Sequence, residues 1–193
     1  MKNYNLPNFG YLIDTLPMNL YNSLITECND AEIKNPEMIS NLTGTDVAKH
    51  YYIMNNKLNL FNYIQSILDK YLNYYPNSAD IRVATDDLPF HFDKPWINYQ
   101  REGQYVPNHN HDGIYSYNIW LKIPKKCIFE FTYTNIIGNI EQFKITLTKE
   151  DEGKIIFFPA KLPHIAYPFN DSNVVRLSIS GNISFKTYND KRA

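Results

Sequence analysis

Hydrophobic residues follow two different periods along the chain. From residue 16 to about residue 76 they recur every three or four positions, as on one face of an α-helix. Pro17 is a suitable first-turn residue, and a second periodic run from about Asn56 to Tyr75 ends at Pro76. The apolar face of this second run is formed by Leu60, Phe61, Ile64, Ile67, Leu68, Tyr71 and Leu72. The first part is therefore predicted to form amphipathic helices.

After Pro76 the pattern changes to short runs rich in β-branched and aromatic residues, separated by Gly, Pro and Asn. The predicted strands cover residues 96–101, 105–111, 115–123, 128–133, 142–148, 154–158, 164–167 and 174–180, with 183–187 as a further candidate. Helices followed by many short strands predict an α+β fold, namely a double-stranded β-helix (jelly roll, cupin-like) with the N-terminal helices packed on one sheet. We expect a single domain over residues 1–193, with a mainly helical lead-in (1–80) and a β-helix core (81–193).

Composition and charge exclude several classes of protein. The chain has 193 residues, and its net charge of −1 argues against a protein that grips phosphate backbones. No apolar run approaches the length of a membrane span, and the N-terminus lacks the features of a signal peptide. Cys28 and Cys127 form no recognisable motif. We therefore expect a cytoplasmic protein with neither nucleic acid nor a membrane as its partner.

Three of the five histidines are candidates for a metal site. His109 and His111 are two residues apart, so on a strand both imidazoles would project from the same side. His164 follows another predicted strand and is the obvious third ligand. A facial set of three ligands leaves adjacent coordination positions open, as iron requires when it binds a co-substrate and dioxygen together.

Arg176 and Ser178 share one face of a later predicted strand. A guanidinium and a hydroxyl at this spacing can hold one carboxylate, the guanidinium by two hydrogen bonds. An inward-facing arginine in a narrow barrel is costly unless an anion pairs with it. Together with the histidines, this pair predicts an anion-binding site.

Segments in a fixed order along the chain resemble the iron(II)- and 2-oxoglutarate-dependent dioxygenases. They are WINYQ at 96–100, GQYVPNHNHDG at 103–113, SYNIWLKIP at 116–124, GKIIFFP at 153–159, LPH at 162–164 and RLSIS at 176–180. Segments at 9–10, 16–17 and 42–52 resemble the helical lead-in of the same family. The chain is most similar to the small oxygenases of phage and marine bacterial genomes that are related to prolyl hydroxylases; if it is phage-encoded, it would act in the host cytoplasm.

The resemblance implies a set of cofactors and the residues that bind them. It implies that Fe(II) is held by His109, His111 and His164. The residues that it assigns to the 2-oxoglutarate pocket are Arg176, Ser178, Ser116, Asn118 and Trp120. It also implies hydroxylation of a C–H bond in a peptide side chain or small molecule, with dioxygen consumed and succinate and CO2 released.

Two alternatives concern the metal ligands. The wider superfamily has a carboxylate where this chain has His111, so Asp112 is the alternative second ligand. His91 and Asp93 form a literal His-x-Asp motif, but Pro89 and Pro95 flank it and make a regular inward-facing strand improbable. We therefore expect His91 to lie outside the metal site.

Two alternatives concern the function. One is a catalytically inactive jelly-roll module that binds a metal or ligand, and the other is a cupin-type enzyme with three histidines, such as a thiol dioxygenase. The Arg176-x-Ser178 pair favours 2-oxoglutarate over both. Residues 85–95 and 134–141 are expected to shape the substrate entrance, while the substrate itself and the oligomeric state stay open.

Overall fold

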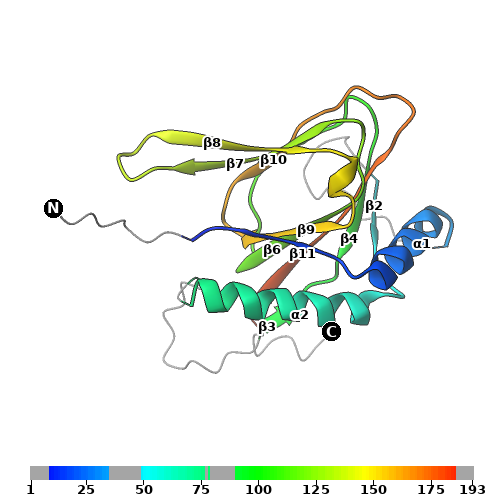
Figure 1. Cartoon of the computed structure of the whole chain (residues 1–193), viewed down its shortest axis with the longest axis horizontal. Coiled ribbons are helices and arrows are strands. Elements are labelled where there is room, and N and C mark those ends of the chain that lie inside the picture. The colour runs from blue at the N-terminus through cyan, green and yellow to red at the C-terminus, as the bar shows by residue number, and fades with distance from the viewer. Residues whose placement is uncertain (1–8, 35–48, 77, 79–89, 186–193) are drawn as a thin grey trace.

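Two antiparallel sheets face each other, and two helices cover the outer face of the larger sheet (Figure 1). The computed structural model describes residues 9–34, 49–76, 78 and 90–185. This arrangement is the double-stranded β-helix of the predicted α+β class, with the helices packed on one sheet, and that prediction is confirmed.

The two helices form where the hydrophobic period predicted them. Helix α1 (Met18–Lys34) begins directly after Pro17, and helix α2 (Lys57–Tyr74) ends just before Pro76. The buried residues of α2 are Leu60, Ile64, Ile67, Leu68 and Tyr71, at three- and four-residue spacing. No helix in the described part of the chain is long and apolar enough to cross a membrane.

The larger sheet has the strand order β1-β9-β6-β11-β4-β2, and β3 also pairs with β11. Its strands are β1 (Leu12–Thr15), β2 (Lys49–Tyr52), β3 (Phe90–Phe92), β4 (Trp96–Gln100), β6 (Tyr115–Lys122), β9 (Lys154–Pro159) and β11 (Arg176–Phe185). The smaller sheet has the order β5-β10-β7-β8. Its strands are β5 (Val106–His109), β7 (Cys127–Thr134), β8 (Ile140–Leu147) and β10 (His164–Ala166).

Side chains alternate between the two faces of the larger sheet and build two apolar layers. Ile119 and Leu121 of β6 point toward the helices, where they join Leu24, Ile64 and their neighbours. Trp120 belongs to a second layer between the sheets, which also contains Ile123, Cys127, Phe129, Phe131, Leu147, Ile156, Phe158 and Phe169. The functional cavity described below lies next to this second layer.

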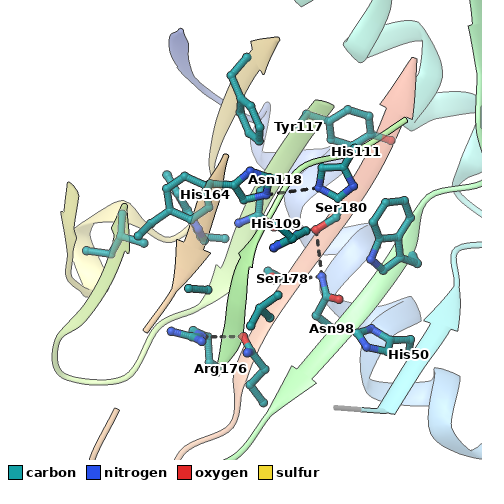
Figure 2. Close-up of a pocket in the computed structure, with 18 of the residues that line it drawn as sticks. His50, Asn98, His109, His111, Tyr117, Asn118, His164, Arg176, Ser178 and Ser180 are labelled. Atoms are coloured by element: carbon teal, nitrogen blue, oxygen red, sulfur yellow. Dashed lines mark hydrogen bonds between the residues drawn. The ribbon is translucent and has the colours of Figure 1, made fainter. Parts of the chain in front are cut away.

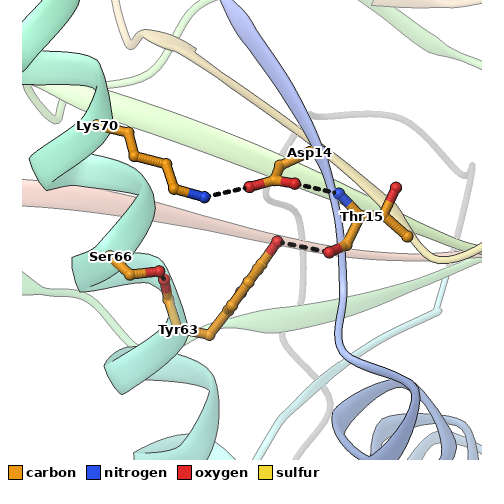
Figure 3. Close-up of polar contacts among 5 residues, drawn as sticks. All are labelled: Asp14, Thr15, Tyr63, Ser66 and Lys70. Atoms are coloured by element: carbon orange, nitrogen blue, oxygen red, sulfur yellow. Dashed lines mark hydrogen bonds and ion pairs between the residues drawn. The ribbon is translucent and has the colours of Figure 1, made fainter.

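Strand β1 is an edge of the larger sheet and is tied to helix α2 by polar contacts (Figure 3). The Lys70 ammonium lies 2.7 Å from an Asp14 carboxylate oxygen, and the Tyr63 hydroxyl donates to the Thr15 carbonyl at 3.2 Å. A short edge strand held in this way presents less unpaired backbone to other chains.

Several elements differ from the sequence prediction. Strands β1, β2 and β3 were not predicted, and β2 lies within the region predicted to be helical. The candidate strand at 183–187 is not separate, because β11 continues without interruption to Phe185. The proposed boundary near residue 80 and the predicted entrance residues 85–89 lie outside the described residues.

Candidate functional site

Three histidine side chains converge at one end of the cavity between the sheets (Figure 2). His109 ends β5 and His164 begins β10, and the two residues lie directly opposite each other in the antiparallel pair. His111 lies beyond the end of β5, where its backbone N–H donates to the Ala160 carbonyl at 2.9 Å. One ring nitrogen from each histidine lies within 4.8 Å of the others.

Backbone carbonyls orient two of the three imidazole rings. His109 Nδ1 lies 2.7 Å from the Pro107 oxygen, and His164 Nδ1 lies 3.0 Å from the Leu162 oxygen. Since a carbonyl accepts a hydrogen bond, each Nδ1 carries the proton and each Nε2 keeps a lone pair. His111 Nε2 lies 3.3 Å from His164 Nε2, and two nitrogens bound about 2.1 Å from one ion lie roughly 3.0–3.4 Å apart. The three rings can therefore share one metal ion.

Burial keeps the three imidazoles neutral. It lowers the pKa of His111 to about 4 and that of His164 to about 3, and the neighbouring His109 lowers both further. The pKa of His109 is also lowered by burial. Aromatic rings of Phe129, Phe131 and Phe158 surround His164 and exclude water from it. Neutral imidazoles are the form that binds metal, so the site needs no deprotonation at neutral pH.

The two other candidate ligands lie elsewhere. The Asp112 side chain is fully exposed and lies 3.6 Å from the Lys161 ammonium, so its carboxylate is not part of the histidine cluster. His91 is also exposed; it lies on a short strand, β3, but its side chain does not face the cavity. Its ring contacts the Asp93 carboxylate at 3.7 Å outside the cavity.

Arg176 lies in the same cavity as the histidines and is almost completely buried. Its Nε donates to Gln100 Oε1 at 2.8 Å, and its Nη1 donates to the Tyr167 carbonyl at 2.8 Å. The guanidinium also lies over the Phe169 ring at 5.3 Å. Its Nη2 is buried without a hydrogen-bond partner among the described residues, and no carboxylate pairs with the cation there. A buried cation left in this state is costly, and an anionic ligand would relieve that cost.

A row of polar side chains crosses the inner face of the larger sheet beside Arg176. Asn98 on β4 donates to Ser178 Oγ at 3.3 Å and to Ser180 Oγ at 2.9 Å, both on β11. Asn118 on β6 links this row to Trp120: its amide oxygen accepts from the indole Nε1 at 2.7 Å, and its nitrogen donates to Ser180 at 3.0 Å. The network fixes the orientation of Trp120, which lines the cavity.

Ser116 differs from the prediction for β6. It shares a face with Asn118 and Trp120, but it does not line the cavity, because its hydroxyl donates to Asn182 Oδ1 at 2.8 Å near the end of the sheet. The predicted entrance segment 134–141 contains the turn between β7 and β8 and also lies outside the cavity lining.

Several residues of the cavity were missed from the sequence, among them the polar residues Asn98, Ser180, Gln100 and His50. Gln100 is the third inward residue of β4 after Trp96 and Asn98, so the alternation of that strand already contained the signal. His50 lies on β2 directly opposite Asn98, and its buried Nδ1 has no partner in the described part of the chain. No local pattern predicted β2, so no signal for His50 was available.

Comparisons with known proteins agree with this geometry. Residues 94–182 match the family described as "Putative 2OG-Fe(II) oxygenase". A prolyl-4-hydroxylase from Pseudomonas putida is similar over 93% of this chain and 94% of its own, with 14% identity and a TM-score of 0.62. The viral collagen prolyl hydroxylase of Paramecium Bursaria Chlorella virus-1, solved with 2-oxoglutarate, is similar over 90% and 94% of the two chains, with 16% identity and a TM-score of 0.55.

The carbocyclase SnoK from nogalamycin biosynthesis shares the fold as well, over 92% of this chain and 80% of its own, with 11% identity and a TM-score of 0.62. No curated protein matches the sequence. The family match covers somewhat less than half of the chain and shows similarity to the 2OG-Fe(II) oxygenases over that segment, and the solved structures show that the chain shares their fold. The cofactors of this class are Fe(II) and 2-oxoglutarate.

Proposed function

We propose that the chain hydroxylates a C–H bond of a peptide side chain or small molecule, and that it couples this to conversion of 2-oxoglutarate to succinate and CO2. The observation that carries the proposal is the presence, in a single cavity, of three histidines and one buried guanidinium that has no carboxylate partner among the described residues. The two prolyl hydroxylases named above share this fold and support a hydroxylation reaction.

Each group in the cavity has a separate task in this proposal. His109, His111 and His164 would hold Fe(II), and the bound ion would supply the oxidative chemistry with dioxygen. Arg176 would bind the distal carboxylate of 2-oxoglutarate and fix the direction in which the co-substrate lies. Trp120, held by Asn118, would form an apolar wall that keeps water from the reacting end.

The three-histidine set has an electrostatic consequence. A neutral imidazole at His111, in place of a carboxylate, leaves one more positive charge on the metal site. Binding of an anionic keto acid should therefore be strengthened. The same charge alters the redox behaviour of the ion. The experiment must therefore distinguish an active oxygenase from a module that binds the metal and the keto acid but oxidises no substrate.

Anaerobic reconstitution tests the binding roles. We expect purified protein with Fe(II) and 2-oxoglutarate to show the visible charge-transfer band of a metal-chelated keto acid. His164→Ala should lose both metal and band, whereas Arg176→Met should keep the metal and lose the band. His91→Ala is the matched control, since this histidine is exposed and outside the cavity, and it should behave as wild type.

Activity is measured on the same samples. Admission of air should release succinate, and a search for products that have gained one oxygen atom among candidate peptides and small molecules would identify the substrate. Absence of the band in folded wild-type protein would contradict the proposal. A normal band without succinate, with and without candidate substrates, would favour the inactive binding module.

A further inference from the structure

Gln100 lies directly opposite Arg176 in the pairing of β4 with β11, and both side chains line the cavity. It is 2% exposed, and its Oε1 accepts the hydrogen bond from Arg176 Nε at 2.8 Å. Figure 2 shows this bond beside Arg176. Its Nε2 is buried and has no hydrogen-bond partner among the described residues.

The chemistry of the pair determines which way the Gln100 amide faces. A guanidinium has only donors, so the amide oxygen must face Arg176 and the NH2 group must point away from it. Two donors that have no partner in the described part of the chain, Gln100 Nε2 and Arg176 Nη2, therefore both lie buried in this cavity. Because an unsatisfied buried donor costs free energy, a pair of them next to a cation indicates a site for an anionic acceptor.

Ser178 is less well placed to be the second donor. Its Oγ accepts from Asn98 Nδ2 at 3.3 Å, which ties it to the polar row, and among the described residues no hydrogen bond joins it to Arg176 as one joins Gln100. Gln100 has an amide nitrogen without a partner among the residues that the structure describes, and its oxygen is held by the cation that attracts the ligand.

We propose that Gln100 is a specificity-determining residue that donates a hydrogen bond to the distal carboxylate of 2-oxoglutarate beside Arg176. This inference rests on the proposed function and adds to it a second residue that, beside Arg176, selects a dicarboxylic keto acid. Gln100 thus has two roles: its oxygen holds the guanidinium, and its nitrogen binds the ligand.

NMR spectroscopy of the side-chain amide separates these two roles. The protein is labelled with 15N-glutamine and loaded with Zn(II) as a diamagnetic substitute, and the Gln100 NH2 signals are assigned by their absence in Gln100→Glu. Addition of 2-oxoglutarate should shift the Gln100 signals and slow the exchange of one amide proton with water. Addition of 2-oxobutanoate, which lacks the distal carboxylate, should leave them in place.

Binding affinity gives the second readout. Gln100→Met should weaken 2-oxoglutarate binding about 10- to 100-fold and leave 2-oxobutanoate binding unchanged. Ser178→Ala should weaken 2-oxoglutarate binding by less than Gln100→Met does. If wild type binds 2-oxoglutarate while the Gln100 amide signals stay unmoved, the inference is wrong and the proposed function stands; if wild type does not bind 2-oxoglutarate at all, the proposed function fails first.

Discussion

Buried histidines are the residues on which this cavity depends most. The ring nitrogens of three histidines converge in the interior, where burial lowers the pKa of His109, His111 and His164. An imidazole kept neutral in the folded state becomes protonated more easily once the chain unfolds. The geometry that prepares the site for a metal therefore makes the metal-free protein sensitive to acid.

The metal-free protein should lose stability as the pH falls below about 6.5, the ordinary pKa of histidine in an unfolded chain. The folded-state pKa values of about 4 for His111 and about 3 for His164 are lower, so the unfolded state binds more protons between these limits. The stabilisation is complete above pH 6.5 and decreases by up to about 1.4 kcal/mol per pH unit for each group as the pH falls toward 4. Urea unfolding with a chelator present, from pH 7.5 to 4.5, measures this dependence.

His164→Asn removes one of these groups, so its free energy of unfolding should change less steeply with pH than that of wild type. His91→Asn, an exposed control, should keep the wild-type slope. Equal slopes for wild type and His164→Asn would contradict the assignment of acid sensitivity to this residue.

The spacing of residues in the sequence indicated polar residues of the cavity only on strands that the sequence also predicted. His109 and His111 were identified from their two-residue spacing, and Arg176 from its two-residue spacing to a serine. Gln100 could be recognised as the neighbour of Arg176 only from the pairing of β4 with β11. Ser116 lies on the same face of β6 as Asn118 and Trp120 but outside the cavity lining, and its distance along the strand from the cavity could not be predicted from the alternation of side chains.

At the scale of elements, Glu27 of α1 joins the two helices. Its carboxylate accepts from the backbone N–H groups of Met54, Asn55 and Asn56 at 2.6–2.9 Å, and from the Asn56 side chain. The Asn56 side chain itself makes no capping bond to α2, and Glu27 instead holds the segment that leads into the helix, including the backbone N–H of the N-cap residue Asn56. The negative charge also suits the positive end of the helix dipole.

Glu27→Ala should lower the free energy of unfolding by about 2–4 kcal/mol, because it leaves several donors at a partly buried helix start without an acceptor. Chemical denaturation measures the loss. Lys70→Ala provides the contrast: it removes only the exposed ion pair with Asp14 and should cost less than about 1 kcal/mol. A loss from Glu27→Ala no larger than that from Lys70→Ala would show that α2 does not depend on these contacts.

The elements absent from the prediction are short strands that depend on partners far along the chain. Strand β2 has four residues and pairs with β4 nearly fifty positions later, and β1 pairs with β9 from the other end of the sequence. Such edge strands carry too few residues for a period of two to be detected, whereas α2, with eighteen residues, shows its period clearly. His50 lies on such a strand, which places it in the cavity wall.

At the scale of the whole molecule, the cavity connects the two sheets. His109 and His164 belong to the smaller sheet, Arg176 and Gln100 to the larger one, and the apolar layer between the sheets lies beside them. A metal ion and a keto acid bound at these groups would link the sheets through contacts that the unfolded chain lacks. Ligand binding should therefore stabilise the fold as a unit.

The metal and 2-oxoglutarate should each raise the unfolding temperature, and the increase caused by 2-oxoglutarate should require bound metal. A ligand at 100 times its Kd adds about 2.7 kcal/mol if it binds only the folded state. Mn(II) alone, as an air-stable probe, should shift the midpoint upward in wild type and in Arg176→Met but not in His164→Ala. 2-Oxoglutarate should add a further shift only in wild type with Mn(II) present, because the keto acid is held at both ends of the cavity. A further shift of equal size in Arg176→Met would mean that the co-substrate binds without the guanidinium.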